Sequence, residues 1–580
     1  MTVYRIIGLA VCAALAACAQ QPPQTAEEPA PAPQAVVAKP QSQPQRPPLP
    51  GVELSEELLY KMMLAEVALQ RGQPHIAVQT YLELARETQD PRIAQRATEV
   101  AWNARLNSAA LEAAGIWLQV DPASAQARQV IAALLVNQAR IADAQPHLEK
   151  WIATGRDSVG QSFLQLSTLL SRHKDKPEVL KLMQALAQPY PDVPEARLAV
   201  AQAAWHAENP QVSLEESRAA LKLRPDWELA ALFIAQVLQR GSNEEALRFL
   251  EEYLRDHPRA RDARLNYARL LVTTKSYPEA RRQFEVLVAE YPQDADVGMA
   301  VALLAMQAND YDAAETQLKR VLELNYKDPD LARFYLGQLN EERKHLDEAL
   351  KWYSTVTQGE QFIPAQARYA AILAKQGKMP EARKHLQEAT ARNPQQRVQL
   401  TQAEAQLLRD ANAHQEAFDV LGQALAQMPD TPDLLYDYAM AAEKVNRLDI
   451  LEANLKQLIK LRPDHAHAYN ALGYTFADRN QRIEEAYRLI ETALKLAPDD
   501  PFIQDSMGWV LYRMGRNQEG LDYLQKAFKR RPDPEIAAHL GEVLWALEKR
   551  DEARKIWGDS LKEHPKNEAL QGTVKRFQPQ

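Results

Sequence analysis

Three consecutive segments decide the fold, and they read AHAYNALGYTFADRNQRIEEAYRLIETALKLAP (466–498), PFIQDSMGWVLYRMGRNQEGLDYLQKAFKRRP (501–532) and PEIAAHLGEVLWALEKRDEARKIWGDSLKEHP (534–565). Each contains a glycine in its first half, and Gly473, Gly508 and Gly541 recur at spacings of 35 and 33 residues. After each glycine come two small residues and then a closing proline, at similar spacings in all three segments. A period of about 34 residues with this pattern is typical of a repeated helix–turn–helix unit.

The same period extends backwards through most of the chain. Stepping back by one period at a time marks one equivalent position in the second helix of each unit, which we call helix B. Thirteen of the fifteen residues at this position are Ala, Gly or Ser. The fifteen residues are Ala77, Ala110, Ala144, Val179, Ser213, Ala246, Ala280, Ala314, Ala349, Ala382, Ala417, Leu451, Ala486, Gly520 and Ala553. They span 476 residues in fourteen steps, a mean of 34.0. Small residues here allow the two helices of a unit to cross closely, because the interaxial distance depends on the side chains at the contact.

Two further positions follow the same register. The first helix of each unit, helix A, has a small residue in fourteen units, with Ile234 as the exception: Ala65, Thr98, Ala132, Ser167, Ala201, Ala268, Ala302, Gly337, Ala370, Ala405, Ala439, Gly473, Gly508 and Gly541. Twelve residues after the helix B position stands a proline in eleven units: Pro122, Pro191, Pro225, Pro258, Pro292, Pro394, Pro429, Pro463, Pro498, Pro532 and Pro565. We expect these prolines to stop helix B, because proline lacks an N–H and clashes with the preceding turn.

This pattern resembles the tetratricopeptide repeat from about Leu54 to Pro565, most strongly over the second half of the chain. The resemblance implies an all-α, right-handed superhelical solenoid of about 13–15 repeats, in which helix A lines the concave surface and helix B faces outward. The units around Arg156–Pro191 are degenerate, and the unit of Gly473 has one extra residue between its helices, at Arg479–Arg482.

Residues 1–17 predict a lipoprotein signal peptide. Ile6–Ala17 is an apolar run of twelve residues, which is too short for a bilayer helix of about 20 residues and suits a secretory signal. The run ends in Leu15-Ala16-Ala17-Cys18, which resembles the bacterial lipobox and implies cleavage between Ala17 and Cys18. Cys18 then carries diacylglycerol and an N-acyl chain, and Ala19 resembles the pattern of Gram-negative lipoproteins sent to the periplasmic face of the outer membrane. The alternative is an ordinary signal peptide that contains Cys18.

The rest of the chain divides into three parts. Residues 18–53 predict a lipidated cysteine followed by a disordered tether, because Pro and Gln dominate this segment and it contains no aromatic residue. Residues 54–567 predict the repeat array, and residues 568–580 predict a C-terminal solvating helix and tail, with Asn567 as the N-cap. No later stretch is apolar enough to span a bilayer, so we expect attachment to the membrane by the lipid alone.

The composition disfavours several classes of protein. There are 69 basic and 77 acidic residues, a formal net charge of −8, and nucleic-acid binding requires a basic face. Both cysteines precede residue 19, and no phosphate-binding loop, HExxH or Gly-x-Ser-x-Gly motif is present. His465 and His467 project about 200° apart on a helix and cannot share a metal. We expect no catalytic residue, no metal, no small-molecule substrate and no cofactor beyond the lipid on Cys18.

Two surfaces are candidates for binding a partner. The repeat register places an aromatic and polar stripe on concave helix A positions, and such stripes hold extended peptides: Tyr436, His467, Asn470, Tyr474, Asp505, Trp509, Tyr512, Glu542 and Trp545. The alternative is that these rings fill the packing between adjacent helices. The second candidate is an N-terminal docking surface of Leu58, Leu59, Met62 and Met63, because Met-rich ends make adaptable surfaces. The alternative is that these four side chains belong to the core of the first repeat.

Two functional classes remain. The layout of signal, lipobox, tether and long repeat array resembles the outer-membrane lipoproteins that partner a periplasmic carboxyl-terminal processing protease. The resemblance implies an adaptor that binds this serine protease and brings cell-wall hydrolases to it as protein substrates, by raising their effective concentration. The alternative is a structural scaffold in an envelope assembly such as polysaccharide export or outer-membrane protein insertion.

Overall fold

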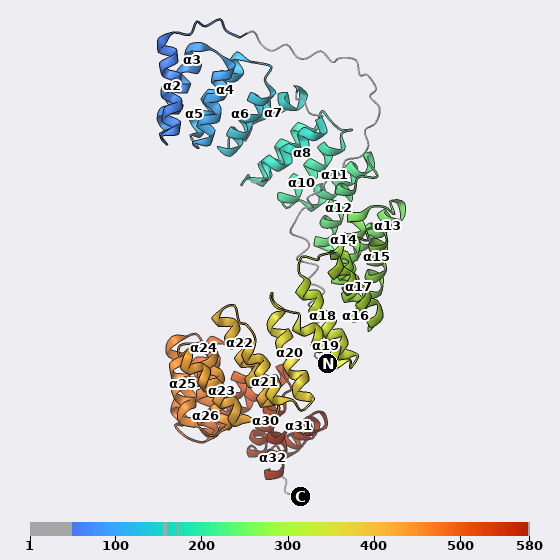
Figure 1. The fold of residues 1–580 in the computed structure, drawn as a ribbon, viewed down its shortest axis with the longest axis vertical. Coiled ribbons are helices and arrows are strands. Elements are labelled where there is room, and N and C mark those ends of the chain that lie inside the picture. The colour runs from blue at the N-terminus through green and yellow to red at the C-terminus, as the bar shows by residue number, and fades with distance from the viewer. Residues whose placement is uncertain (1–48, 155–158, 172, 578–580) are drawn as a thin grey trace. The chain divides into compact units, whose positions relative to one another are not determined.

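The computed structural model describes residues 49–154, 159–171 and 173–577. The predicted signal peptide, Cys18 and most of the predicted tether lie outside these residues. The described part of the chain is all-helical, with 31 helices and no strand, and it forms two compact units, up to Leu324 and from Asn325 (Figure 1). None of the described helices is long and apolar enough to cross a membrane.

Unit 1 contains eight successive helix pairs. Their bounds are α2 (Glu56–Gln70), α3 (Pro74–Thr88), α4 (Pro91–Asn103), α5 (Asn107–Val120), α6 (Ala125–Asn137), α7 (Ile141–Thr154), α8 (Val159–Leu170), α9 (Lys176–Ala187), α10 (Pro194–His206), α11 (Pro210–Leu223), α12 (Glu228–Gly241), α13 (Asn243–Asp256), α14 (Arg261–Thr273), α15 (Tyr277–Glu290), α16 (Ala295–Gln307) and α17 (Tyr311–Glu323). The even-numbered helices are helix A and the odd-numbered ones helix B. The degenerate region thus still forms a pair, α8 and α9.

Unit 2 contains seven pairs and a final single helix. Their bounds are α18 (Pro329–Glu342), α19 (Leu346–Ser354), α20 (Phe362–Lys375), α21 (Met379–Glu388), α22 (Pro394–Asp410), α23 (His414–Gln427), α24 (Pro432–Lys444), α25 (Leu448–Leu461), α26 (Ala466–Asp478), α27 (Ile483–Leu496), α28 (Pro501–Arg513), α29 (Asn517–Arg530), α30 (Pro534–Ala546), α31 (Arg550–Glu563) and α32 (Glu568–Phe577). Fifteen pairs are therefore present in the described residues, at the upper end of the predicted range.

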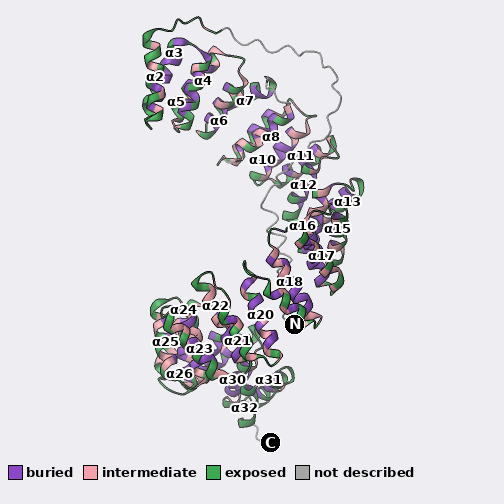
Figure 2. Cartoon of the chain, in the orientation of Figure 1, coloured by how far each residue is buried: buried purple, intermediate pink, exposed green. Residues whose placement is uncertain are grey.

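The predicted repeat register is confirmed residue by residue. Each of the fifteen helix B positions lies in the second helix of a pair and is buried, including the large Val179 and Leu451. Ile234, the exception in helix A, is also fully buried. Figure 2 shows the buried residues on the faces where helices meet and the exposed residues on their outer sides.

In most pairs the turn between the two helices uses a left-handed residue, whereas the turn from α12 to α13 does not, because Ser242 there has φ of −153°. Asn309, Asn412 and Asn446 have φ of 58°, 58° and 59°, and Gly515 has φ of 79°. Asn and Gly adopt this conformation most readily, so they end helix A without strain. The extra residue in the repeat that contains Gly473 is confirmed, because the turn between its two helices contains two left-handed residues, Asn480 and Arg482.

The prolines end helix B with one exception. Nine of the eleven stand two residues beyond the last residue of helix B, and Pro191 stands four residues beyond Ala187, where α9 ends. Pro394 is different and opens α22, six residues after α21 ends at Glu388. The expectation that Pro394 stops helix B was therefore wrong: proline is well accepted at the first helical position. The end of α21 is completed instead by Arg397, which donates to the carbonyls of Gln387 and Ala389 at 3.0 and 2.7 Å.

The last pair is covered by α32. Asn567 accepts a hydrogen bond from the N–H of Leu570 at 2.9 Å, as expected of its N-cap. Leu570 is fully buried in a cluster with Leu544 and Trp557. The C-terminal end of unit 2 therefore presents a polar outer face, as solenoid ends require.

Glycines mark the closest approach of helix A and helix B. A Cβ added to Gly508 would lie 2.9 Å from the carbonyl oxygen of Gly520, and one added to Gly520 would lie 2.7 Å from the carbonyl oxygen of Gly508. At Gly541 an added Cβ would overlap the ring of Trp557. The backbones and large helix B side chains thus occupy the space that a side chain would need.

We predict opposite effects for two glycine-to-alanine substitutions. Gly508→Ala should lower the free energy of unfolding by about 1–3 kcal/mol, because its methyl group overpacks the crossing. Gly558→Ala, in the interior of α31 with no atom within 4 Å of the added Cβ, should raise it by about 0.5–1 kcal/mol through the lower entropy of the unfolded chain. Urea unfolding followed by circular dichroism measures both, and equal effects would contradict the proposed crossing.

Candidate functional site

The nine predicted stripe residues lie on four successive A helices of unit 2. Tyr436 is on α24, three residues are on α26 (His467, Asn470 and Tyr474), three on α28 (Asp505, Trp509 and Tyr512), and two on α30 (Glu542 and Trp545). The structure brings some of them together and separates others.

His539 of α30 lies at the centre of the residues that contact one another. Its Nδ1 lies 3.0 Å from both carboxylate oxygens of Asp505, and its Nε2 lies 3.4 Å from the hydroxyl of Tyr474. Its ring stacks on that of Trp509 with centroids 4.2 Å apart and an interplanar angle of 23°. Tyr474, Asp505, Trp509 and His539 thus form one cluster across α26, α28 and α30.

Trp509 is a core residue. It is only 3% exposed, and its indole N–H has no hydrogen-bond partner among the described residues. The guanidinium of Arg513 lies 4.8 Å from its ring centroid and donates to the carbonyl oxygen of Asp478 at 2.8 Å. Of the two interpretations of the stripe, packing between adjacent helices therefore describes Trp509.

A second polar group borders this cluster. Glu542 is buried, accepts a hydrogen bond from the Tyr512 hydroxyl at 3.4 Å and pairs with Arg576 of α32. Burial raises the pKa of Glu542, although Arg576 and His539 act in the opposite direction. Burial likewise raises the pKa of Tyr474. Asp505 and Glu542, two predicted polar members of the stripe, therefore connect helices to one another.

Trp545 is separate from this cluster. Its ring packs against those of Trp557 and Phe577, with centroids 5.8 and 6.1 Å away, and Arg550 and Arg554 lie over it at 5.4 and 5.6 Å. Trp545 therefore joins α30 to α31 and α32.

The remaining stripe residues lie further along the A helices. Tyr436 is half-buried, and its ring centroid is 5.5 Å from that of His465. His467 is exposed, with Nε2 3.8 Å from a carboxylate oxygen of Asp500. The Oδ1 of Asn470 is buried and has no hydrogen-bond partner in the described part of the chain.

His539 is the residue that sequence reasoning missed. It stands 34 residues after Asp505, one repeat period, and Arg576 stands 34 residues after Glu542. A search for oppositely charged residues one period apart on A helices finds both pairs.

The predicted N-terminal surface is largely exposed. Leu59, Met62 and Met63 of α2 are exposed, whereas Leu58 is half-buried. The structure adds neighbours that were not predicted, above all Tyr60, Leu64 and Val67 on the same helix. Core packing therefore does not account for the exposed members of this surface.

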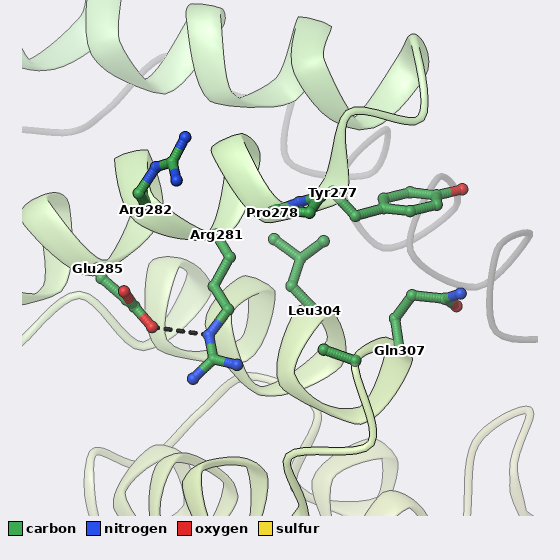
Figure 3. A pocket seen from close by; sticks show the side chains of 8 residues that line it. Tyr277, Pro278, Arg281, Arg282, Glu285, Leu304 and Gln307 are labelled. Atoms are coloured by element: carbon green, nitrogen blue, oxygen red, sulfur yellow. Dashed lines mark hydrogen bonds and ion pairs between the residues drawn. The ribbon is translucent and has the colours of Figure 1, made fainter.

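A cavity of about 440 Å³ lies between α15 and α16 in unit 1 (Figure 3). Arg281 on its wall donates to Glu285 and to Asp310, at 2.7 Å in each case. Tyr277 and Leu304 line the opposite side. Arg282, which also lines the cavity, pairs with Glu279. Because both arginines are already paired with carboxylates, neither is a free cation for an anionic ligand.

The fold and these surfaces define a class of protein, an all-α helical-repeat scaffold. Models of the tetratricopeptide repeat match residues 237–304, 300–361, 436–501 and 506–568. The chain is 34% identical over 492 residues to the TPR repeat-containing protein PA4667 of Pseudomonas aeruginosa, covering 84% of this chain and 82% of that protein. The chain belongs to the tetratricopeptide-repeat proteins, and its fold fits a non-catalytic scaffold for protein–protein interaction.

More distant similarities are partial. Cellulose synthase operon protein C of Pseudomonas fluorescens is 28% identical over 308 residues, which are 48% of this chain and 24% of that protein. Among solved structures, yeast Tom70 is 12% identical with a TM-score of 0.34, covering 90% of this chain and 96% of that one. A structure of Naa15/Naa10 bound to HypK-THB is 12% identical with a TM-score of 0.30, at 90% and 89% coverage.

We predict that His539 makes unit 2 less stable as the pH rises. Burial lowers the pKa of His539, but Asp505, and with it Asp478 and Glu542, outweighs burial and raises it above its usual value. The stabilisation that comes from a raised histidine pKa is fully present below the pKa of the unfolded state, about 6.5. It is lost as the pH rises through the pKa of the folded state. Urea unfolding of wild type against pH should show this decline above pH of about 6.5.

Two variants isolate the cause. His539→Gln should remove the decline, because it removes the titrating group. His564→Gln, at an exposed position after α31, is the control and should keep it. A decline that persists in His539→Gln would assign the pH dependence to other groups.

Proposed function

We propose that this protein is a lipid-anchored adaptor on the periplasmic face of the outer membrane of a Gram-negative bacterium. It binds and activates a carboxyl-terminal processing serine protease and presents protein substrates, the cell-wall hydrolases, to it. The sequence layout supports this proposal: an apolar leader ending in Ala-Ala-Cys, a Pro/Gln-rich segment and a long repeat array.

The observation that carries the proposal is the apolar N-terminal end of unit 1. Ten of the eighteen exposed large apolar residues in the described part of the chain lie between Leu49 and Ile76. Tyr60 is 66% exposed and Met63 is 60% exposed. Exposed apolar residues gathered in one short stretch of the chain are typical of an interaction site, whereas singly scattered ones are ordinary surface.

The shape of this surface favours a helical partner segment. Tyr60, Met63, Leu64 and Val67 follow one another at helical i, i+3, i+4 and i+7 spacing, so they form one apolar stripe on α2. No described helix precedes α2 to cover this stripe, whereas later A helices pack against a preceding helix B, as α4 does against α3. An amphipathic helix of the protease, seated like the helix B of a preceding repeat, would bury the stripe.

The position of this surface also suits an anchored adaptor. In the sequence, 37 residues separate Cys18 from Glu56. An extended Pro-rich segment of this length reaches roughly 100 Å. A protease bound to α2 would thus be held within roughly 100 Å of the membrane, at a raised effective concentration.

A second candidate function is a structural scaffold in an envelope assembly for polysaccharide export. The partial similarity to Cellulose synthase operon protein C favours it. The two functions differ in what binds the protein: a serine protease for the adaptor, a secretin or porin for the scaffold.

We predict that Cys18→Ala releases the protein from the membrane. The lipid on Cys18 is the only membrane attachment that we propose, so the variant should move from the outer-membrane fraction to the soluble periplasmic fraction. Its circular dichroism spectrum should be unchanged, because the array begins well after residue 18. Sedimentation of Cys18→Ala with outer membranes would contradict lipid anchoring.

We also predict that Met63→Glu and Tyr60→Glu weaken protease binding at least tenfold. A charge in the apolar stripe would have to be desolvated in the complex. The melting temperature should hardly change, because both side chains are exposed in the free protein. Titration calorimetry with the purified carboxyl-terminal processing protease of the same organism measures binding, and degradation of a hydrolase measures activation.

Leu461→Glu is the matched control, because Leu461 is an exposed apolar residue on α25 of unit 2. It should bind the protease as wild type does. Wild-type affinity in both α2 variants would refute docking on this helix. Recovery of a secretin or porin with the wild-type protein, and not with the α2 variants, would instead support the scaffold.

A further inference from the structure

The apolar stripe of α2 has one charged residue at each of its ends. Glu56 stands four residues before Tyr60, and Arg71, the C-cap of α2, stands four residues after Val67. Residues four positions apart lie on the same side of a helix, so both charges continue the stripe. We call this surface the α2 face, and it consists of Glu56, Tyr60, Met63, Leu64, Val67 and Arg71.

The two end charges of the α2 face are the charges of this helix that a partner can reach. Glu56 and Arg71 are exposed, and neither side chain forms an ion pair or a hydrogen bond within the described residues. By contrast, Glu57 lies 3.3 Å from Lys61, and Glu66 is paired with the next helix A. The apolar stripe marks the docking surface, and the charges at its ends decide which way round a helix fits it.

The repeats themselves show how such end charges are paired between antiparallel helices. At the pair α10 and α11, Arg224 at the end of helix B lies 2.5 Å from Glu195 at the start of helix A. At the pair α28 and α29, Arg530 at the end of helix B lies 2.8 Å from Asp499, just before helix A. In both pairs the basic C-terminal end of one helix meets the acidic N-terminal end of the other, as the helix macrodipoles favour.

The α2 face has the same polarity as these A helices. Its acidic residue, Glu56, is at the start of the helix, and its basic residue, Arg71, is at the end. The other side of α2 is already buried in unit 1, where Ala65 is fully buried and Ala68 is 3% exposed. A helix that docks antiparallel on the α2 face would therefore bring its last turn to Glu56 and its first turn to Arg71.

We propose that the partner helix runs antiparallel to α2, with basic residues in its last turn facing Glu56 and acidic residues in its first turn facing Arg71. This rests on the proposed function, which makes α2 the docking site for the protease, and it adds the direction and the charge pattern of the helix that binds there. A parallel helix with the same pattern would place like charges together at both ends. Glu56 and Arg71 therefore determine specificity, because complementary charges fix the orientation and exclude wrong partners more than they add affinity.

The length of the α2 face sets the length of the partner helix. Fifteen residues separate Glu56 from Arg71, which is about 22 Å along a helix axis. A partner helix that meets both charges needs about four turns. We therefore expect its acidic and basic ends to stand about fifteen residues apart.

Charge reversal tests the charge pattern. Glu56→Lys and Arg71→Glu should each weaken binding of the purified carboxyl-terminal processing protease to the full-length protein about fivefold in about 25 mM NaCl. In about 500 mM NaCl the loss should fall below about twofold, because salt screens exposed charges. Glu552→Lys, at an exposed glutamate in the first turn of α31, is the matched control and should bind as wild type does in both salt concentrations.

Photo-crosslinking tests the orientation. Leu59 and Gln70 are exposed, and their spacing of eleven residues places them on one side of α2, beside the α2 face and near its two ends. Each is replaced in turn by the photo-crosslinking residue p-benzoylphenylalanine, and the crosslinked protease peptide is identified by mass spectrometry. The crosslink from position 59 should map to a later residue of the protease helix than the crosslink from position 70.

Four results would overturn the proposal. Crosslinks in the reverse order would show a parallel helix. Wild-type affinity of both charge variants in low salt would show that Glu56 and Arg71 do not select the partner, and it would leave docking on α2 intact. A loss of equal size in both salt concentrations would trace to a damaged α2 rather than to lost charge pairing. Failure of the wild-type protein to bind the protease would refute the proposed function as well.

Discussion

The close crossing of helix A and helix B is the constraint on which the structure depends. At Gly508 and Gly520 each helix approaches the carbonyl oxygen of the other so closely that a methyl group does not fit. At other pairs alanine suffices, as at Ala302 and Ala314, both fully buried. Because this crossing recurs every period, each pair presents the same faces to the next pair, and the outer faces remain free to vary.

Polar contacts repeat with the same period. Asp505 meets His539 and Glu542 meets Arg576 at a separation of 34 residues, and Gln402 donates to Asp437 at a separation of 35. In unit 1, Ser167 donates to Gln202 at 35. Such pairs join equivalent helices of neighbouring repeats, so their energy is local, as in a one-dimensional array. Removing one partner of a buried pair is strongly destabilising, because it leaves a desolvated group unpaired.

The sequence predicted the repeats well because the crossing is local to each unit. Small residues at one spacing are sufficient to locate both helices, even where Val179 or Ile234 departs from the pattern. It predicted the stripe less well, because helical position gives the direction of a side chain but not what covers it. Trp509 is covered by His539 of the next repeat, and Trp545 by α31 and α32.

A cavity of about 320 Å³ between α4 and α6 in unit 1 was missed for a related reason. Trp102 and Trp117 lie on different helices of one pair, and the amides of Gln126 and Gln129 lie on the next helix A. None of them forms an aromatic stripe in the sequence, and only the folded pairs bring them to one cavity. The opening of α22 at Pro394 was missed because the residue fits the spacing of a terminator and the chemistry of a helix start equally well.

The two ends of the array differ in how their outer faces are covered. At the C-terminal end α32 buries the apolar face of the last pair, whereas α2 leaves its outer stripe open. Burying that stripe against a partner yields free energy in proportion to the apolar area removed from water. The same helix contributes Met62 and Glu66 to the wall of a cavity of about 480 Å³ between α2 and α4. A partner on the outer face of α2 would therefore bind a helix that also forms a wall of this cavity.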